Sequence, residues 1–101
     1  MDDISWDDRD GMRWIALEGE LDSTGILELQ ERFHKALAGG TGDVVVMLTG
    51  VRFLSSLAVG MLLKAREELQ KQGRRLMLSG VSPSARRALE LMQLANVFEE
   101  V

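Results

Sequence analysis

The sequence predicts an α/β domain in which helices pack on a mixed sheet of about four strands. Two strand-like segments at the N-terminus precede apolar runs that alternate with segments of helical periodicity, in the order ββαβαβα. Strand–helix–strand connections make the connected strands parallel and the crossover right-handed. The 101 residues suffice for one domain and not for two, so residues 1–101 are assigned to a single domain.

The first two strands are expected to form a hairpin. Residues 4–6 and 12–17 are strand-like, and the turn-rich DDRDG at 7–11 separates them. The charges of the first strand suit an exposed sheet edge. Five aspartates occur in the first ten residues. Their irregular spacing lacks the Gly and Glu of a calcium loop, which indicates a solvated acidic edge rather than a cation site.

The first helix is predicted from apolar residues at helical spacing after GELDSTG, residues 19–25. These residues form one buried stripe: Ile26, Leu29, Phe33 and Leu37. Ser23 or Thr24 can cap the helix, because a hydroxyl oxygen accepts hydrogen bonds from the N–H groups of a first turn. Gly39 and Gly40 should end it.

The rest of the chain is expected to supply two more strands and two more helices. DVVVML at 43–48 is a β-branched run without alternation, which is typical of a strand covered on both faces. A helix from about Ser56 to Gln72, ended by Gly73, should lead to a strand, RRLMLSG, at 74–80.

The third helix should begin at Pro83 with Ser82 as its cap. Its expected buried stripe contains Ala85, Leu89 and Met92. In the tail that follows, Val97 and Phe98 are expected to pack back onto the body of the domain.

Composition excludes several classes of protein. The chain is 46% hydrophobic and 28% charged, and its net charge of −4 argues against binding to nucleic acid. The arginine pairs at 74–75 and 86–87 are interpreted as solvated ends of secondary structure. The chain has no cysteine, which excludes disulfides and thiolate metal sites. We find neither a signal-peptide pattern nor the roughly 20 apolar residues of a membrane helix, and expect a cytoplasmic protein without membrane insertion.

No pattern in the sequence predicts catalysis. His34 is the single histidine and should lie on the surface flank of the first helix, without a second ligand or acid beside it. The chain lacks the G-x-S-x-G elbow of a serine hydrolase and any metal-ligand cluster. GGTGD at 39–43 precedes a strand and lacks the Lys-Ser/Thr of a phosphate loop, which indicates a turn. We therefore expect no enzymatic activity, no cofactor and no metal.

The segment VRFLSSLAVGML, residues 51–62, places two serines inside an apolar run. Ser55 and Ser56 come between a strand and a helix, at the carboxyl end of a parallel strand, where α/β domains carry their functional groups. Capping of the helix explains Ser55 and does not require Ser56.

The apolar residues around these serines have two possible roles. Phe53 and Leu62 are assigned to the core. Leu57, Val59 and Leu63 lie on the flank of the predicted helix, where they form an exposed docking patch or are covered by the first or third helix. The sequence leaves both alternatives open.

Nearly the whole chain resembles the STAS domain family, and specifically the small bacterial anti-sigma-factor antagonists. The resemblance is carried by GELD at 19–22, by DVVVMLTGVRFLSS at 43–56 and by the run at 74–99. It implies that Ser56 is the serine phosphorylated by a partner kinase, a histidine-kinase-like ATPase that is also the anti-sigma factor, and that a phosphatase reverses the reaction. It also implies that the Asp22 loop, with Ser23 and Thr24, borders the partner surface.

The serine motif departs from the family pattern at three positions. Ser55 replaces an aspartate, Leu57 a small hydroxyl residue and Ala58 a glycine. Two functions are therefore carried forward. The first is a partner-switching regulator controlled at Ser56. The second is an unphosphorylated STAS binding subunit of a transporter ATPase or a larger signalling assembly.

Overall fold

A computed structural model describes residues 3–101, so that Met1 and Asp2, one of the five N-terminal aspartates, lie outside the described residues. Its sheet has the order β1-β2-β3-β4-β5. The strands are β1 (Ile4–Arg9), β2 (Met12–Leu21), β3 (Val44–Leu54), β4 (Leu76–Ser79) and β5 (Glu99–Glu100). The helices are α1 (Ile26–Ala38), α2 (Ser56–Lys71) and α3 (Pro83–Leu91).

The predicted α/β fold with a mixed sheet is confirmed, with one more strand than the expected four. β1 pairs with β2 antiparallel, whereas β2, β3, β4 and β5 pair parallel in succession. The additional strand is β5, two residues of the predicted tail that join β4 through the pair Met77 and Glu99. A strand this short has no alternating pattern that the sequence could display.

The β1–β2 hairpin closes through Asp10 and Gly11, whose φ angles of 55° and 76° both lie in the left-handed region. Such a turn matches the twist of paired strands, and aspartate followed by glycine is a favoured pair for it. β1 forms one edge of the sheet, as expected from its charges.

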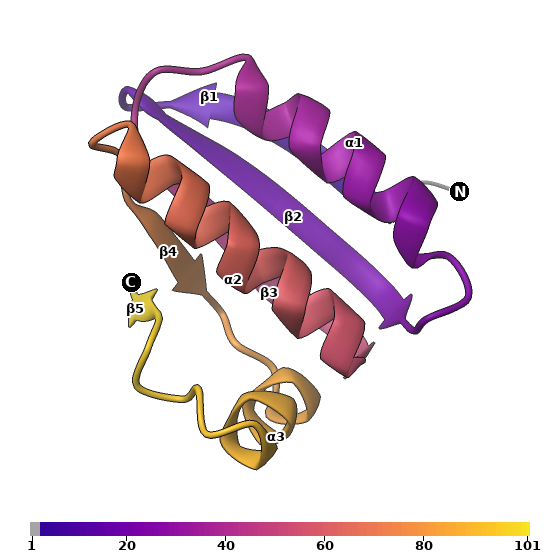
Figure 1. Cartoon of the computed structure of the whole chain (residues 1–101). Coiled ribbons are helices and arrows are strands. Elements are labelled where there is room, and N and C mark those ends of the chain that lie inside the picture. The colour runs from indigo at the N-terminus through magenta and orange to yellow at the C-terminus, as the bar shows by residue number, and fades with distance from the viewer. Residues whose placement is uncertain (1–2) are drawn as a thin grey trace.

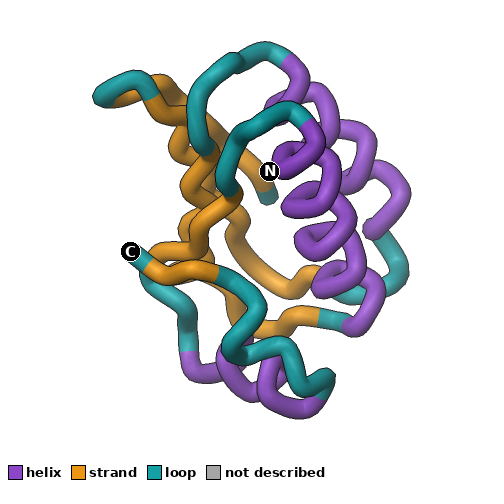
Figure 2. The backbone as a smooth tube through the Cα atoms, turned by 60° about the vertical axis from the view of Figure 1, so that its left-hand side comes forward, coloured by secondary structure: helices purple, strands orange, loops and turns teal. Residues whose placement is uncertain are grey.

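Two long helices cover one face of the sheet. α1 and α2 lie side by side on that face, whereas α3 lies toward one end of the sheet (Figures 1 and 2). The predicted α1 stripe is buried, and the helix ends at Gly39 as expected. Ile15, Leu48 and Leu62 are fully buried between these layers. None of the helices in residues 3–101 is long and apolar enough to cross a bilayer.

Arg13 joins the hairpin to the last turn of α1, a link that the sequence did not indicate. Its guanidinium donates to the carbonyl of Ala36 at 2.7 Å and to both carboxylate oxygens of Asp8, and it stacks 3.9 Å from the ring centroid of Trp6. Hydrogen bonds from Arg13 lower the pKa of Asp8. A cation at this position also complements the negative end of the helix dipole.

Arg74 is buried, so its assignment to a solvated strand end was wrong. Its Nε donates to the carbonyl of Gly42 at 2.7 Å, and Nη1 donates to Oε1 of Gln72 at 3.1 Å. These acceptors allow a guanidinium to leave solvent. Arg75 is exposed, as expected, and pairs with Glu99.

α3 begins as predicted, with Pro83 in its first turn and Ser82 as its cap. Ala85 and Leu89 are buried, but Met92 is exposed, because the helix ends at Leu91 and Met92 lies beyond its apolar stripe. The tail packs back as expected: Phe98 is buried and Val97 is partly buried against the core. Arg86 pairs with Glu100 in this tail.

Candidate functional site

The carboxyl ends of β2 and β3 meet the start of α2 at one edge of the domain (Figure 1). β3 extends to Leu54, further than the predicted strand, and Leu54 pairs with Leu21. The N–H of Ser55 then donates to the carbonyl of Leu21 at 3.0 Å. This bond continues the ladder by one residue and places the Asp22 loop next to the serines.

Ser55 is the N-cap of α2, which confirms its predicted role. Its backbone is extended, with φ −73° and ψ 163°, and its Oγ accepts from the N–H of Ala58 at 3.2 Å. Its carbonyl accepts from the N–H of Val59 at 3.0 Å. Ser55 is half-buried in this capping position. A phosphate on its Oγ would therefore compete with the cap.

Ser56 is exposed and is the first residue of α2. The N–H groups of a first helical turn have no partner within the helix, and the dipole makes this end favourable for an anion. The first turn of α2 holds no acidic residue. Ser56 therefore combines an accessible hydroxyl with a backbone setting that tolerates negative charge.

Asp22, Ser23 and Thr24 form an exposed loop beside the serines. Oδ1 of Asp22 accepts from the N–H of Thr24 at 3.1 Å, a local turn that fixes the carboxylate. The prediction that Ser23 or Thr24 caps α1 was wrong. The N-cap is Gly25, without a side-chain bond, because the helix begins only at Ile26.

The apolar residues of the serine segment are distributed differently from what we expected. Leu57 is 53% exposed, but Val59 is fully buried and Leu63 is partly buried against the core. Val59 is thus covered and belongs to no exposed patch. Phe53, which we had assigned to the core, is 50% exposed.

The exposure of Phe53 follows from an irregularity in the pairing of β2 with β3. The register shifts between Gly19 and Glu20, and β3 has two consecutive exposed residues, Arg52 and Phe53, where alternation would allow one. Two glycines inside the strands are local signals for such an irregularity: Gly50 in β3, and Gly19 in β2, which lies at the shift and has a φ of 89°. Phe53 and Leu57 therefore precede and follow the two serines as exposed apolar side chains. We refer to Asp22, Phe53, Ser56 and Leu57 as the serine edge.

A family model described as STAS domain matches residues 3–101. The chain belongs to the STAS domain family. The family assignment made from the sequence is thereby confirmed, and no curated protein sequence matches this STAS domain.

Solved structures share the fold of this STAS domain. An anti-sigma factor antagonist from Mycobacterium paratuberculosis is 24% identical, with a TM-score of 0.82, over 96% of this chain and 82% of that one. The phosphorylated form of the Bacillus cell fate determinant SpoIIAA is 21% identical, with a TM-score of 0.70, over 97% and 90%. A sulfate transporter family protein from Wolinella succinogenes is 18% identical, with a TM-score of 0.70, over 88% and 72%.

The serine edge of this STAS domain combines apolar, acidic and hydroxyl side chains, all of them exposed. Within residues 3–101, no group of three or more His, Asp or Glu side chains is arranged to hold a metal ion. His34 lies on α1, exposed and outside the serine edge. The edge offers two apolar side chains, one carboxylate and one accessible hydroxyl.

Proposed function

We propose that this STAS domain is an anti-sigma-factor antagonist that acts by partner switching. In this proposal its unphosphorylated form binds a serine-kinase anti-sigma factor with a histidine-kinase-like ATPase fold and thereby releases the sigma factor. The observation that carries the proposal is the exposed hydroxyl of Ser56 at the first position of α2, next to a second serine that already provides the cap. The similarity in fold to proteins described as anti-sigma factor antagonists supports it.

Phosphorylation of Ser56 would control binding through charge. A phosphate adds about −1.5 to −2 charges, which the N–H groups and dipole of α2 stabilise in the isolated domain. A partner that covers Phe53 and Leu57 would remove water from the same phosphate, and the loss of hydration opposes binding. The kinase thus dissociates from its own product, and a phosphatase restores the binding form. The domain itself performs no chemistry in this cycle.

A second candidate function is constitutive binding, as the STAS subunit of a transporter ATPase or of a larger assembly. Leu57 favours it, because this side chain is 53% exposed beside Ser56 and increases the apolar character of the edge. The similar fold of a sulfate transporter family protein supports it as well. In this case the serine edge is a permanent interface, and Ser56 contributes as a small residue.

Capture from the native cell followed by phosphorylation distinguishes the two functions. The domain is immobilised, the captured proteins are identified, and a captured histidine-kinase-like ATPase is purified and incubated with the domain and ATP. We expect one phosphate on Ser56, mapped by mass spectrometry, and none in Ser56→Ala. We also expect Ser56→Asp to weaken binding to the kinase at least tenfold, whereas Ser56→Ala binds as the parent does.

Ser55→Ala is the matched control, because it removes the neighbouring hydroxyl and leaves Ser56 in place. It should still be phosphorylated. Phosphate on Ser55, or no phosphate from a kinase shown to be active on another substrate, would overturn the switching proposal. The switching proposal would also be contradicted if the captured proteins were transporter subunits that bind Ser56→Ala and Ser56→Asp equally well. A negative charge at position 56 would then have no effect on binding.

A further inference from the structure

One face of the sheet has no cover in residues 3–101. The helices α1, α2 and α3 lie on the other face or beyond the end of the sheet (Figures 1 and 2). Yet β3 begins with VVVML, a run without alternation of the kind found in strands covered on both faces, and parallel sheets are generally covered on both. The sequence of β3 is therefore that of a strand with two covers, of which the described chain supplies one. We call the uncovered face the open face.

The open face is apolar along its centre. Trp14, Val45 and Met77 lie side by side in one row across β2, β3 and β4, and Ala16 and Met47 are neighbours in the next row. Val45 and Met77 are buried, yet neither belongs to the core between the sheet and the helices. Trp14, Ala16 and Met47 remain partly exposed. Aromatic and methionine side chains are enriched in protein interfaces, so this composition is that of an interface rather than of a solvated sheet.

Charged residues flank the apolar centre in two adjacent rows. Asp7 on β1 and Glu99 on β5 end the row that contains Trp14. Arg9 on β1 and Arg75 before β4 end the neighbouring row. Within the chain Arg9 pairs with Asp7 at 3.4 Å and stacks 4.7 Å from the ring centroid of Trp14, and Arg75 pairs with Glu99. Both sides of the open face thus present one arginine and one carboxylate in the same order.

This order of charges is self-complementary under a two-fold axis. An axis that runs across the strands, between the two rows, turns a second copy face to face with the first and sets its acidic row over the arginine row. Arg9 of each copy then faces Asp7 of the other, and Arg75 faces Glu99. The same axis separates Glu18, an exposed acid further along β2, from its counterpart. A second copy therefore meets opposite charges at both sides of the face.

Two further features of the open face fit a second copy. Asp43, inside the arginine row, accepts from the N–H of Arg75 at 2.9 Å and lies 3.9 Å from its guanidinium, so it adds no unpaired charge. The face is about 20 Å across its five strands and about 30 Å along β2, or about 600 Å² in projection. This size is comparable with the roughly 800 Å² per partner that a standard interface buries.

We propose that two copies of this domain associate through their open faces into a two-fold dimer. The sheets stack with their strands within about 30° of each other, and the alternating arginines and carboxylates close the two sides. Trp14 of each copy packs against Met12 of the other, a favourable contact between an aromatic ring and a thioether. The interface lies at the beginning of β2 and β3, whereas the serine edge lies at their carboxyl ends. The dimer therefore does not depend on the switching proposal.

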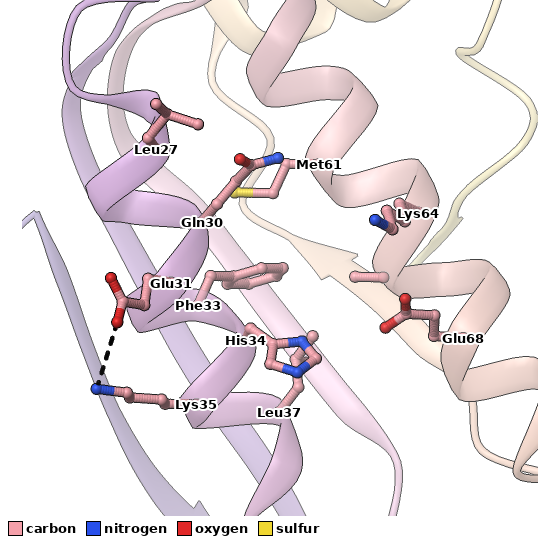
Figure 3. A pocket seen from close by; sticks show the side chains of 11 residues that line it. Leu27, Gln30, Glu31, Phe33, His34, Lys35, Leu37, Met61, Lys64 and Glu68 are labelled. Atoms are coloured by element: carbon pink, nitrogen blue, oxygen red, sulfur yellow. Dashed lines mark ion pairs between the residues drawn. The ribbon is translucent and has the colours of Figure 1, made fainter.

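Sedimentation equilibrium of the whole chain, from about 1 μM to about 500 μM, measures this association. We expect a monomer–dimer equilibrium with a dissociation constant in the micromolar range. Arg9→Glu should weaken the dimer at least tenfold, because it turns an attractive contact that occurs twice into a repulsive one. Lys35→Glu is the matched control, since it makes the same change of charge on α1, where Lys35 pairs with Glu31 in the helical layer (Figure 3). This control should dimerise as the parent does.

A mixture of two variants tests the position of the axis. Arg9→Glu has acids at both positions 7 and 9, whereas Asp7→Lys has bases at both. Each variant alone should associate at least tenfold more weakly than the parent, and an equimolar mixture should regain an affinity close to that of the parent. Both positions are exposed, and circular dichroism checks that the fold is retained.

Three results would overturn the proposal. The first is a parent that stays monomeric at about 500 μM, which would leave the open face to a different protein. The second is a dimer that Arg9→Glu leaves unchanged, or that Lys35→Glu weakens as much, since the contacts of the open face would then not hold it together. The third is a mixture of Arg9→Glu and Asp7→Lys that associates no better than either variant alone.

Discussion

The two capping serines of this domain differ in one measurable respect. Oγ of Ser55 and Oγ of Ser82 each accept from a backbone N–H three residues later at 3.2 Å. Only Ser82 also donates, to the carbonyl of Val51 at 2.8 Å, and so fastens the start of α3 to β3. Replacing each serine by alanine therefore compares a cap alone with a cap that also makes a tertiary hydrogen bond.

The expected magnitudes follow from these bonds. Loss of a serine cap costs about 1 kcal/mol, which we assign to Ser55→Ala. Ser82→Ala loses in addition the bond to Val51, worth about 1 kcal/mol more, for a total of about 2 kcal/mol. In a domain of this size these losses correspond to reductions in Tm of roughly 5 °C and roughly 10 °C.

Urea unfolding followed by far-UV circular dichroism measures both losses as free energies of unfolding. Ser84→Ala is the control, because Ser84 is exposed in the first turn of α3, and its effect should stay within about 0.5 kcal/mol. Equal losses for Ser55→Ala and Ser82→Ala would refute the reasoning, since the bond to Val51 would then contribute nothing.

Three further predictions concern other parts of the molecule. Gly60→Ala should stabilise the domain by about 0.5–1 kcal/mol, because Gly60 lies inside α2 with nothing within 4 Å of an added Cβ. Gly42→Ala should destabilise the domain in the same urea assay, because its Cβ would fall 2.1 Å from the carbonyl oxygen of Gly11. If Gly42→Ala were the more stable variant, this account of the packing would be wrong. Hydrogen bonds from Arg86 hold the pKa of Glu100 below its ordinary value of 4.5, so this carboxylate stabilises the fold above that value and ceases to do so as the pH falls through the lowered pKa. When the pH is lowered from about 6 to about 3, the free energy of unfolding of Glu100→Gln should therefore fall less than that of the parent. An equal fall would mean that the pair of Arg86 and Glu100 contributes nothing to the stability of the fold. Leu57→Ser should leave the unfolding free energy within about 0.5 kcal/mol while it weakens capture of the partner, and a large loss of stability would mean that Leu57 packs in the core.

Local signals predicted the ends of the helices well. A residue that starts or ends a helix acts on backbone groups within a few residues of itself, so its role can be predicted from the neighbouring sequence. The residues predicted in this way are Ser55, Ser82, Pro83 and Gly39. The start of α1 is the exception. There the Asp22 side chain takes the N–H of Thr24, and the helix begins later, without a side-chain cap.

Features set by distant parts of the chain were not predictable. Arg74 was expected to be solvated, and nothing in the sequence marked Arg13 as buried. Backbone carbonyls at the end of α1 and in the following loop accept hydrogen bonds from the two buried guanidinium groups. Phe53 appeared to continue an apolar strand, but a register shift against β2 turns it outward. The sequence of elements along the chain, the parallel pairing of strands joined by a helix, and the position of Ser56 at a strand-to-helix junction did follow from the sequence.

The two edges of the sheet limit how another protein can approach. Many recognition domains accept a ligand peptide as an additional strand, which requires a long edge with unpaired backbone groups. Here one edge is β1, where Asp7, Asp8 and Arg9 place charges along the strand, and the other is β5, only two residues long. Charged and very short edge strands are poor templates for strand addition. Main-chain pairing is thus disfavoured at both edges, so the proposed partner would have to be recognised through side chains at the end of the sheet, where a phosphate would change the charge of a contact rather than the pairing of a strand.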